Sequence, residues 1–457
     1  MSLPQSILYL KKGNIFRNEY FGGLIFSIQR AQYYEINKLG FYMISLINGE
    51  LSAEDIVEQT LKYYELQSDE SARIELENYL LDLLAHDFLT FEAKDRIQIK
   101  EIEPCPERKY LSFPLEAYLY LTQNCNQRCM FCYNPRRKSS LMLSLDEWKN
   151  VIDKLIALRV CTIGVLGGEP FLEKNKLISI LEYTNGKVHQ AITTNGTANG
   201  GITKQQAKRL ACFPNLEINV SLESGNPDVH DAIVGLNGAL NIAKRTIENL
   251  VDAGVTVVLK MVATNCNYQD LPNLVKWAKG VGIAGAYVLD YMPEAGQTLK
   301  DFKKLSLNHE SFFALIDSIE EYKDDDFFVM KNTRYRFVDM GTSIPIQSSL
   351  VYKSSICTAG NIGIHVMSDG DVFPCPLAIG NKKYKIGNVL NNSMMQIWNS
   401  TVLSDFRERD SNKLENKTCI ACSKYTGCIG GCPLVAEMFT GSTYGGDPRC
   451  RLVAAYE

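Results

Sequence analysis

Six strand-forming segments alternate with helical segments between residues 116 and 289, and this alternation restricts the fold more than any other feature. Strands that follow one another through a helix run parallel, because the helix carries the chain back to the starting edge of the sheet. In parallel α/β barrels the functional side chains lie at the carboxyl ends of the strands. The predicted strands are Glu116–Thr122, Thr162–Leu166, His189–Thr193, Leu216–Ser221, Val255–Val262 and Ala286–Leu289.

Helices are expected between these strands. Ser144 and Glu147 have the spacing of a capping box at the start of a helix that reaches Arg159. Further helices are predicted over Leu240–Ala253 and Leu271–Lys279.

Three cysteines follow the first strand with the spacing C-x3-C-x2-C: Cys125, Cys129 and Cys132. Three thiolates can bind three corners of an iron–sulfur cube and leave the fourth iron without a protein ligand. A structural zinc ion with a fourth ligand from elsewhere is the alternative, although zinc sites usually show paired C-x2-C spacings. Phe131, directly before the last cysteine, is also less typical of zinc sites.

Polar motifs follow the next three strands at the same edge of the predicted sheet. Gly167-Gly168-Glu169-Pro170 combines glycines that let the backbone approach a ligand with a carboxylate that can accept hydrogen bonds from an ammonium group. Thr193-Thr194-Asn195-Gly196 ends the third strand, and Ser221-Leu222-Glu223 ends the fourth. Each motif alone is most often a turn, but their ordered series indicates one binding site.

The cysteine triplet and this series resemble the radical S-adenosylmethionine (SAM) enzymes. The resemblance implies a partial (β/α)6 TIM-like barrel over residues 115–300, with a [4Fe–4S] cluster on the catalytic cysteines and SAM on its fourth iron. In that family the reduced cluster cleaves SAM to a 5′-deoxyadenosyl radical, which abstracts a substrate hydrogen. The implied SAM-binding residues are Phe131, Gly167, Gly168, Glu169, Pro170, Thr194, Asn195, Ser221 and Glu223.

The segment from His230 to Gly235 departs from the family, which often has an arginine there for the SAM carboxylate. Val234 cannot bind a carboxylate. Lys260, on the fifth strand, is one candidate for that role, and a solvated lysine at a strand edge is the equal alternative.

The last hundred residues carry a second cysteine array, with spacings C-x12-G-x4-C, C-x2-C-x5-C-x3-C and a final cysteine. The array resembles the SPASM extension of radical SAM enzymes, which implies two auxiliary [4Fe–4S] clusters in residues 351–457 and three clusters in all. By that resemblance, the outer cluster is bound by Cys419, Cys422, Cys428 and Cys450, and the inner cluster by Cys357, Cys375 and Cys432.

Two cubane clusters need eight ligands, and the array has seven cysteines. The inner cluster is therefore expected to have an open iron, where a substrate thiolate can bind because soft sulfur ligands suit such sites. A fourth ligand from elsewhere, such as Cys105 or water, is the alternative. Cys161, Cys212 and Cys266 are interpreted as packing residues.

Residues 1–95 lack cysteine and predict a winged-helix-like domain. Ser6–Lys12 is expected to be a strand and Tyr20–Tyr33 a hairpin that turns at Gly22 and Gly23. Two helices follow, the first capped by Ser52 with Asp55 and the second carrying an apolar stripe. The stripe consists of Leu76, Leu80, Leu83 and Leu84.

The charge of this domain argues against nucleic acid as its ligand. It has 8 Lys and Arg against 15 Asp and Glu, a net charge of −7, whereas a DNA-binding domain needs a basic face. It resembles the PqqD-like elements of peptide-modifying enzymes, in which a leader peptide adds a strand to the sheet edge. An inert N-terminal cap is the alternative. Residues 96–114 are predicted to be a linker and 301–350 a connecting region.

The chain has no apolar stretch of the roughly 18 residues that a membrane span needs, and its start lacks the apolar core of a signal peptide. We therefore expect a cytoplasmic protein that does not bind membranes. Its 14 cysteines are expected to be metal ligands or thiols, because the cytosol keeps thiols reduced.

The reaction expected from these features is thioether formation in a ribosomally made precursor peptide, as in sactipeptide and ranthipeptide maturases. Pro376 stands where sulfatase-maturating relatives have an aspartate base, which argues against that reaction. We expect a cysteine-containing precursor bound through its leader, and an electron donor such as flavodoxin or ferredoxin. A radical SAM enzyme that makes carbon–carbon crosslinks or oxidises side chains, and a zinc-stabilised regulatory binding protein, are the alternatives.

Overall fold

A computed structural model describes residues 6–97, 110–133, 142–294, 296–332, 357–422, 430–450 and 453. Contacts divide the chain into two units, one formed mainly by residues up to Phe113 and the other mainly by residues from Pro114 onward. Each unit is described by itself. Cys105, Cys428 and parts of the predicted linker and connecting region lie outside the described residues.

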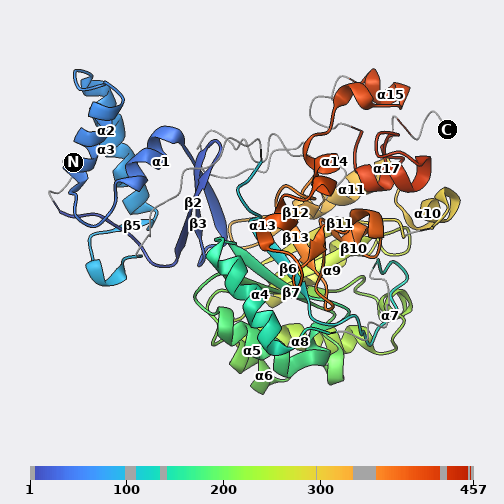
Figure 1. Ribbon diagram of the computed structural model, residues 1–457. Helices are drawn as coiled ribbons and strands as arrows, with labels where there is room; N and C mark the ends of the chain where they lie inside the picture. The colour runs from blue at the N-terminus through green and yellow to red at the C-terminus, as the bar shows by residue number, and fades with distance from the viewer. Residues whose placement is uncertain are drawn as a thin grey trace. The chain divides into compact units, whose positions relative to one another are not determined.

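The first unit contains a three-stranded antiparallel sheet followed by three helices (Figure 1). The sheet has the order β2-β3-β4, so β3 is paired on both sides and β2 and β4 are the outer strands. A separate antiparallel pair joins β1 to β5. The elements are β1 (Tyr9–Leu10), β2 (Asn14–Glu19), β3 (Gly22–Ser27), β4 (Gln32–Asn37), α1 (Lys38–Ser45), α2 (Ala53–Tyr63), α3 (Glu70–Ala85) and β5 (Leu89–Thr90).

The predicted position of the hairpin turn is wrong. Gly22 and Gly23 do not form the turn but begin β3, and the chain turns at Tyr20 and Phe21 between β2 and β3. The glycines are required by close packing, because a Cβ at Gly23 would lie 2.2 Å from the Phe41 ring. The predicted strand Ser6–Lys12 is reduced to the two residues of β1.

The start of α2 agrees with the prediction from the sequence. Ser52 and Asp55 form the predicted capping box of α2, each side chain bonding the other residue's backbone amide. Leu76, Leu80 and Leu83 are buried in the core of the unit, and Leu84 packs against it partly buried. A helix with this spacing presents one apolar face, which is why the stripe predicts the core.

The second unit is built on a ten-stranded sheet with the order β12-β11-β10-β9-β8-β7-β6-β13-β14-β15. The predicted strands are confirmed, with no bound shifted by more than two residues: β6 (Glu116–Tyr120), β7 (Thr162–Leu166), β8 (His189–Thr194), β9 (Leu216–Ser221), β10 (Thr256–Ala263) and β11 (Gly285–Asp290). Parallel pairing joins β6 to β7 and connects β8 through β11 in series. This is the central parallel sheet expected of a TIM-like partial barrel.

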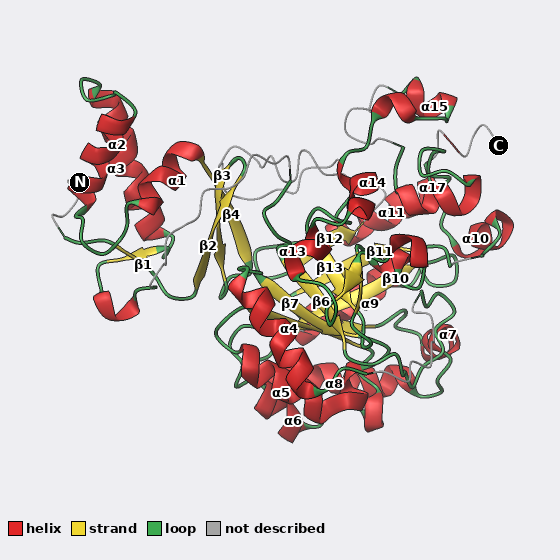
Figure 2. Cartoon of the chain, viewed as in Figure 1, coloured by secondary structure: helices red, strands yellow, loops and turns green. Residues whose placement is uncertain are grey.

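Helices cover the outer face of this sheet, as Figure 2 shows for α4, α5, α6 and α8. Ser144 and Glu147 form the predicted capping box of α4. The helices are α4 (Leu145–Ala157), α5 (Lys174–Thr184), α6 (Lys204–Leu210), α7 (Pro227–Val234), α8 (Ala239–Asp252), α9 (Leu271–Val281), α10 (Leu299–Leu305) and α11 (His309–Glu320).

Four strands that the sequence did not predict extend the sheet at both edges. β12 (Phe328–Asn332) pairs parallel with β11. At the other edge β13 (Gly363–Val366) pairs parallel with β6, and β14 (Asp371–Phe373) and β15 (Gly387–Asn388) follow antiparallel. The cysteine-rich C-terminal region therefore joins the barrel sheet directly beside the strand that precedes the cysteine triplet.

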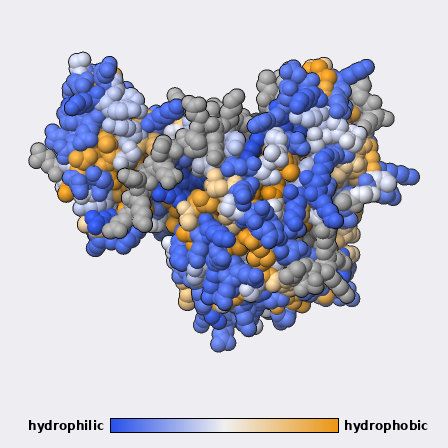
Figure 3. Space-filling model, in the orientation of Figure 1, coloured by the Kyte–Doolittle hydropathy of each residue, from blue (hydrophilic) through white to orange (hydrophobic). Residues whose placement is uncertain are grey.

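Short helices complete the second unit: α13 (Met394–Trp398), α14 (Ser404–Arg407), α15 (Lys417–Ile420) and α17 (Pro433–Thr440). No helix among the described residues is long and apolar enough to cross a membrane. The face of the molecule seen in Figure 3 is mainly hydrophilic, with scattered apolar side chains.

Candidate cluster and SAM site

The cysteine triplet lies on the loop that leaves β6, at the carboxyl end of the parallel strands. Cys125 and Cys129 are partly buried and Cys132 is exposed. The three thiols are close enough to act on one another electrostatically, and burial raises the pKa of Cys125 and Cys129. Ligation to iron would keep these thiols deprotonated, because the thiolate is the metal-binding form.

Gly167 and Gly168 hold the loop after β7 against the cysteine loop. The Gly168 amide donates to the Thr122 carbonyl over 2.7 Å, and the Glu169 amide donates to the Asn124 carbonyl over 2.8 Å. A Cβ would lie 2.4 Å from the Thr122 oxygen at Gly167, and 2.0 Å from the Asn124 oxygen at Gly168. The two glycines are therefore needed for contact between two loops, a role that the sequence motif alone did not indicate.

The Glu169 side chain is fully buried at the junction of the strand ends. Its carboxylate accepts hydrogen bonds from the Phe171 amide (3.0 Å), the Thr194 hydroxyl (2.7 Å) and the Asn195 amide (2.8 Å). Burial raises the pKa of Glu169 to about 7, and these hydrogen bonds oppose the rise. A bound ammonium group would also favour the ionised carboxylate, because it carries the opposite charge.

Asn195 connects the third strand to the cysteine loop. Its side-chain amide donates to Asn126 Oδ1 over 3.0 Å and to the Cys125 sulfur over 3.7 Å. Its Oδ1 accepts from the amide and hydroxyl of Thr197, both over 2.8 Å. Gln127 belongs to the same network, because its Nε2 donates to the Thr197 hydroxyl over 3.2 Å. Sequence reasoning missed Asn126, Gln127 and Thr197, although the first two lie between the predicted ligands.

Glu223 is a second buried acid, and it lies near Cys129 of the triplet. Its carboxylate accepts from the Val262 amide over 2.9 Å, and its own amide donates to His230 Nδ1 over 3.1 Å. Glu223 acts electrostatically on Cys129, and burial raises the Glu223 pKa to about 8. Ser221 ends β9 opposite Lys260, and Pro170 is buried in the turn after Glu169.

The segment that lacks the family's arginine supports the cysteine loop. The amides of Arg128 and Met130 donate to the carbonyls of Val234 and Ile233 over 2.8 and 3.0 Å. Val234 belongs to a small apolar cluster against which Cys129 and Phe131 pack. Valine at this position therefore shapes the loop that carries the cysteines.

Lys260 reaches from β10 toward the third strand, where its ammonium donates to the Thr193 hydroxyl over 3.3 Å. The same ammonium lies 5.9 Å from the centre of the Tyr287 ring. Burial lowers the Lys260 pKa, and Glu217 and Glu116 oppose this effect. These contacts exclude the solvated strand-edge interpretation, and the role toward a SAM carboxylate remains a prediction.

Asp290, at the end of the sixth strand, is engaged by the C-terminal region. Arg449 contacts its carboxylate over 3.3 Å and forms hydrogen bonds of 2.6 to 3.2 Å with both oxygens of Asp447. The Cys432 amide in turn donates to Asp447 over 3.1 Å. This series of contacts joins the carboxyl end of β11 to Cys432, a predicted ligand of the inner cluster.

Three cysteines of the second array, the predicted inner set, lie close enough to act on one another electrostatically. Burial raises the pKa of the partly buried Cys375 thiol, and Cys357 and Cys432, which act on it electrostatically, raise this pKa further. For the outer set, the Glu415 amide bonds the Tyr444 carbonyl over 3.1 Å, which brings the segments that carry Cys419 and Cys450 side by side. Cys422 follows α15, and Cys428 lies outside the described residues.

Two of the three cysteines interpreted as packing residues are exposed, so that interpretation is wrong for them. Cys161 is buried, but Cys212 and Cys266 are exposed. Cys212 follows α6 and Cys266 lies in the loop after β10, so neither belongs to a helix or strand whose periodicity could place its sulfur.

Within the described part of the chain, no three His, Cys, Asp or Glu side chains converge closely enough to bind one metal ion together. A zinc site needs such convergence, with each sulfur about 2.3 Å from a single ion. In a cubane each thiolate binds its own iron at a separate corner. A cluster and a zinc ion therefore require different arrangements of the same cysteines.

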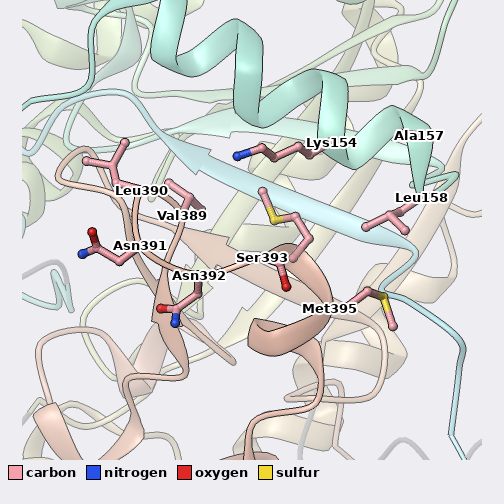
Figure 4. A pocket seen from close by; sticks show the side chains of 10 residues that line it. Lys154, Ala157, Leu158, Val389, Leu390, Asn391, Asn392, Ser393 and Met395 are labelled. Atoms are coloured by element: carbon pink, nitrogen blue, oxygen red, sulfur yellow. The ribbon is translucent and has the colours of Figure 1, made fainter.

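A depression elsewhere in this unit is unrelated to the site (Figure 4). It lies between the last turn of α4, with Lys154 and Leu158, and the segment Val389–Met395. The last turn of α4 leads to the amino end of β7, whereas the predicted site follows the carboxyl ends of the strands.

Two protein families match parts of the chain, and individual relatives match most of it. Residues 119–278 match the radical SAM superfamily, and residues 357–423 match the iron-sulfur cluster-binding domain SPASM. The chain is 27% identical over 365 residues to mycofactocin maturase MftC of Mycolicibacterium smegmatis, covering 76% of this chain and 87% of MftC. It is 24% identical over 432 residues to the antilisterial bacteriocin subtilosin biosynthesis protein AlbA of Bacillus subtilis, covering 93% and 90%.

A solved structure shares the fold over nearly the whole chain. Streptococcus suis SuiB bound to S-adenosylmethionine superposes with a TM-score of 0.74 at 19% identity, covering 97% of this chain and 100% of SuiB. SuiB bound to its precursor peptide SuiA gives a TM-score of 0.72 at 18% identity, covering 98% and 99%. This likeness shows the fold of both units.

Proposed function

We propose that this chain, which has a radical SAM domain and a SPASM domain and is homologous to peptide maturases, forms thioether crosslinks in a ribosomally made precursor peptide. The crosslink joins a cysteine sulfur to a carbon of an acceptor residue. The overall change removes two hydrogens from the peptide, one from the thiol and one from the acceptor carbon.

The residues at the strand ends fit a cluster and SAM. Cys125, Cys129 and Cys132 would bind the first cluster. The three hydrogen bonds to Glu169 favour its carboxylate form, and this carboxylate would hold the SAM amino group. When bound, SAM with the first cluster supplies a hydrogen-abstracting radical, and the auxiliary clusters supply an electron acceptor. An electron donor such as flavodoxin or ferredoxin would reduce the first cluster.

The observation that carries the thioether proposal is the composition of the inner cysteine set. Cys357, Cys375 and Cys432 act on one another electrostatically, and these three thiolates leave one corner of a cubane for another ligand. Asn361 follows Cys357 where some relatives have a further cysteine. Its side-chain amide is held by the carbonyls of Cys357 (3.0 Å) and Ala359 (3.3 Å). These contacts support an open fourth corner on the inner cluster, which a substrate thiolate would occupy.

The first unit supports peptide recognition. Its outer strands β2 and β4 belong to a sheet whose edge could be extended by a leader peptide, and its negative charge disfavours nucleic acid. SuiB, which shares the fold of this unit as well, has been solved with its precursor peptide bound. We propose the same kind of partner for this chain.

Anaerobic purification tests the cluster assignment. Three clusters require about twelve irons per chain, and alanine at Cys125, Cys129 or Cys132 should remove about four irons and abolish reductive SAM cleavage. Stoichiometric zinc without iron would support the zinc-binding protein instead.

Co-expression with a cysteine-rich precursor tests the reaction. A loss of two hydrogens for each thiol consumed, located by fragmentation at a cysteine and an acceptor residue, is the expected result. A modified peptide that keeps all its thiols would favour the second candidate, carbon–carbon crosslinking or side-chain oxidation.

A further inference from the structure

Asp447 joins two segments that carry predicted cluster ligands. Its carboxylate accepts a hydrogen bond from the Cys432 amide over 3.1 Å, and its main-chain carbonyl accepts one from the Cys450 amide over 3.0 Å. Its own amide donates to the Gly430 carbonyl over 2.9 Å. A Cβ at Gly431 would lie 2.5 Å from the Asp447 Cβ, so the turn before Cys432 packs directly against this residue. Asp447 therefore holds the backbone at one ligand of the inner set and at one ligand of the outer set.

Arg449 extends these contacts to the barrel. Its guanidinium forms an ion pair of 2.6 Å with Asp447 and one of 3.3 Å with Asp290. Asp290, Arg449 and Asp447 are only 5%, 8% and 5% exposed. Hydrogen bonds between charged groups are stronger than those between neutral groups, and the planar guanidinium fixes the direction of each partner. The three side chains therefore form one continuous connection from the Cys432 turn to Asp290.

Asp290 is the last residue of β11, at the carboxyl end of the parallel strands. Glu169 and Asn195, which are predicted to bind SAM, follow the carboxyl ends of β7 and β8 at the same edge of the sheet. Cys375 follows β14, which lies beyond β6 on the other side of the parallel strands. The inner cysteine set is therefore connected to the sheet on both sides of β6 to β10, and Arg449 makes the connection at β11.

We propose that Arg449 is a positioning residue, which anchors the Cys432 turn at the carboxyl end of β11 so that a sulfur bound at the inner cluster lies beside the acceptor carbon. This inference rests on the proposed function, because it takes Cys432 as a ligand of that cluster and the substrate thiolate as the ligand of its open corner. Two reacting atoms must be held close together and aligned, and a small displacement lowers the rate strongly. Arg449 acts through the Cys432 turn and is not a catalytic residue.

Asp290→Ala tests the anchor, because it removes the partner on β11 and leaves Asp447 to bond both Arg449 and the Cys432 amide. In the anaerobically reconstituted full chain, hydrogen exchange measured by mass spectrometry should be about tenfold faster at residues 430–436, as expected when a hydrogen bond between charged groups is lost. The number of SAM molecules cleaved per crosslink formed in a cysteine-containing precursor should rise several-fold. Asp325→Ala is the matched control, because it removes an exposed carboxylate before β12 and should change neither quantity.

Asp290→Asn is the conservative variant. It keeps an acceptor oxygen for Arg449 without the negative charge, so both quantities should lie between those of the unsubstituted protein and those of Asp290→Ala. If Asp290→Ala lost auxiliary iron, Asp290→Asn would replace it in both measurements, and values equal to those of the unsubstituted protein would contradict the inference.

The outcomes separate this inference from the proposed function. Unchanged exchange in an Asp290→Ala protein that keeps its auxiliary iron and forms thioethers would overturn the role of Arg449 and leave the proposed function intact. Faster exchange with an unchanged ratio of SAM cleavage to crosslinks would show a contact that only stabilises the fold, and would also overturn it. A precursor that the unsubstituted protein leaves with all its thiols would overturn the proposed function, and the exchange measurement would still decide whether the anchor exists.

Discussion

The Glu169 carboxylate accepts a hydrogen bond from the Asn195 amide over 2.8 Å, and this contact joins the second and third strand ends of the barrel. The same side chain bonds Thr194 and Phe171, while Asn195 reaches the Cys125 sulfur. One buried acid therefore links three loops of the candidate SAM site, including the loop that carries the cysteine triplet.

Glu169→Gln should weaken SAM binding. A glutamine has only one acceptor oxygen, so at least one of the three donors loses its partner, at a cost of about 1–3 kcal/mol. The SAM amino group would also lose a negative partner, and we expect the dissociation constant to rise about tenfold or more. Isothermal titration calorimetry measures this. Glu182→Gln, at an exposed surface position, is the control and should bind SAM normally.

Gly168→Ala should disrupt the cysteine loop. A Cβ there would lie 2.0 Å from the Asn124 carbonyl oxygen, a contact that backbone atoms cannot relieve without moving the loop. We expect loss of iron from the first cluster and loss of SAM cleavage, both measured after anaerobic reconstitution. Gly280→Ala, in α9, meets no atom within 4 Å and should instead be neutral or slightly stabilising. Normal iron content in Gly168→Ala would contradict the loop contact.

Glu223 should make the stability of the cluster-free protein depend on pH. Burial raises its pKa to about 8, whereas an unfolded glutamate titrates near 4.3. The folded state therefore holds the proton more tightly, and the contribution to stability is complete below about pH 4.3 and is lost as pH rises through 8.

Urea unfolding at pH 5.5 and 8.5 measures this effect. The unsubstituted protein should lose more stability between the two pH values than Glu223→Gln, whose amide imitates the protonated acid. Glu169 contributes in the same direction to both proteins, so the difference reports Glu223. Equal losses in the two proteins would show that Glu223 titrates normally.

Glu19→Ala should destabilise the first unit by about 3–5 kcal/mol, because it leaves the buried Arg17 charge without its carboxylate. Glu19 also bonds the amide and hydroxyl of Ser112 over 2.7 and 3.0 Å, so the end of the unit is held by the same side chain. Differential scanning calorimetry should show a lower unfolding temperature for the first unit. Replacing both Arg17 and Glu19 by leucine should cost less than Glu19→Ala alone, since no unpaired charge remains buried.

Features that depend on local spacing could be predicted from the amino-acid sequence. Alternating strands and helices predicted β6 to β11, and the capping boxes at Ser52 and Ser144 marked the starts of α2 and α4, because these signals act between residues close in the chain. The cysteine spacings likewise predicted the clusters, which the matches to the radical SAM and SPASM families support.

Contacts between residues far apart in the chain could not be predicted and are known from the folded structure. In the folded chain β13 lies beside β6, Gly168 brings two loops together, and Val234 packs with Cys129. These contacts join segments tens to hundreds of residues apart. Their geometry arises from how the whole sheet packs, so no local pattern in the chain encodes them.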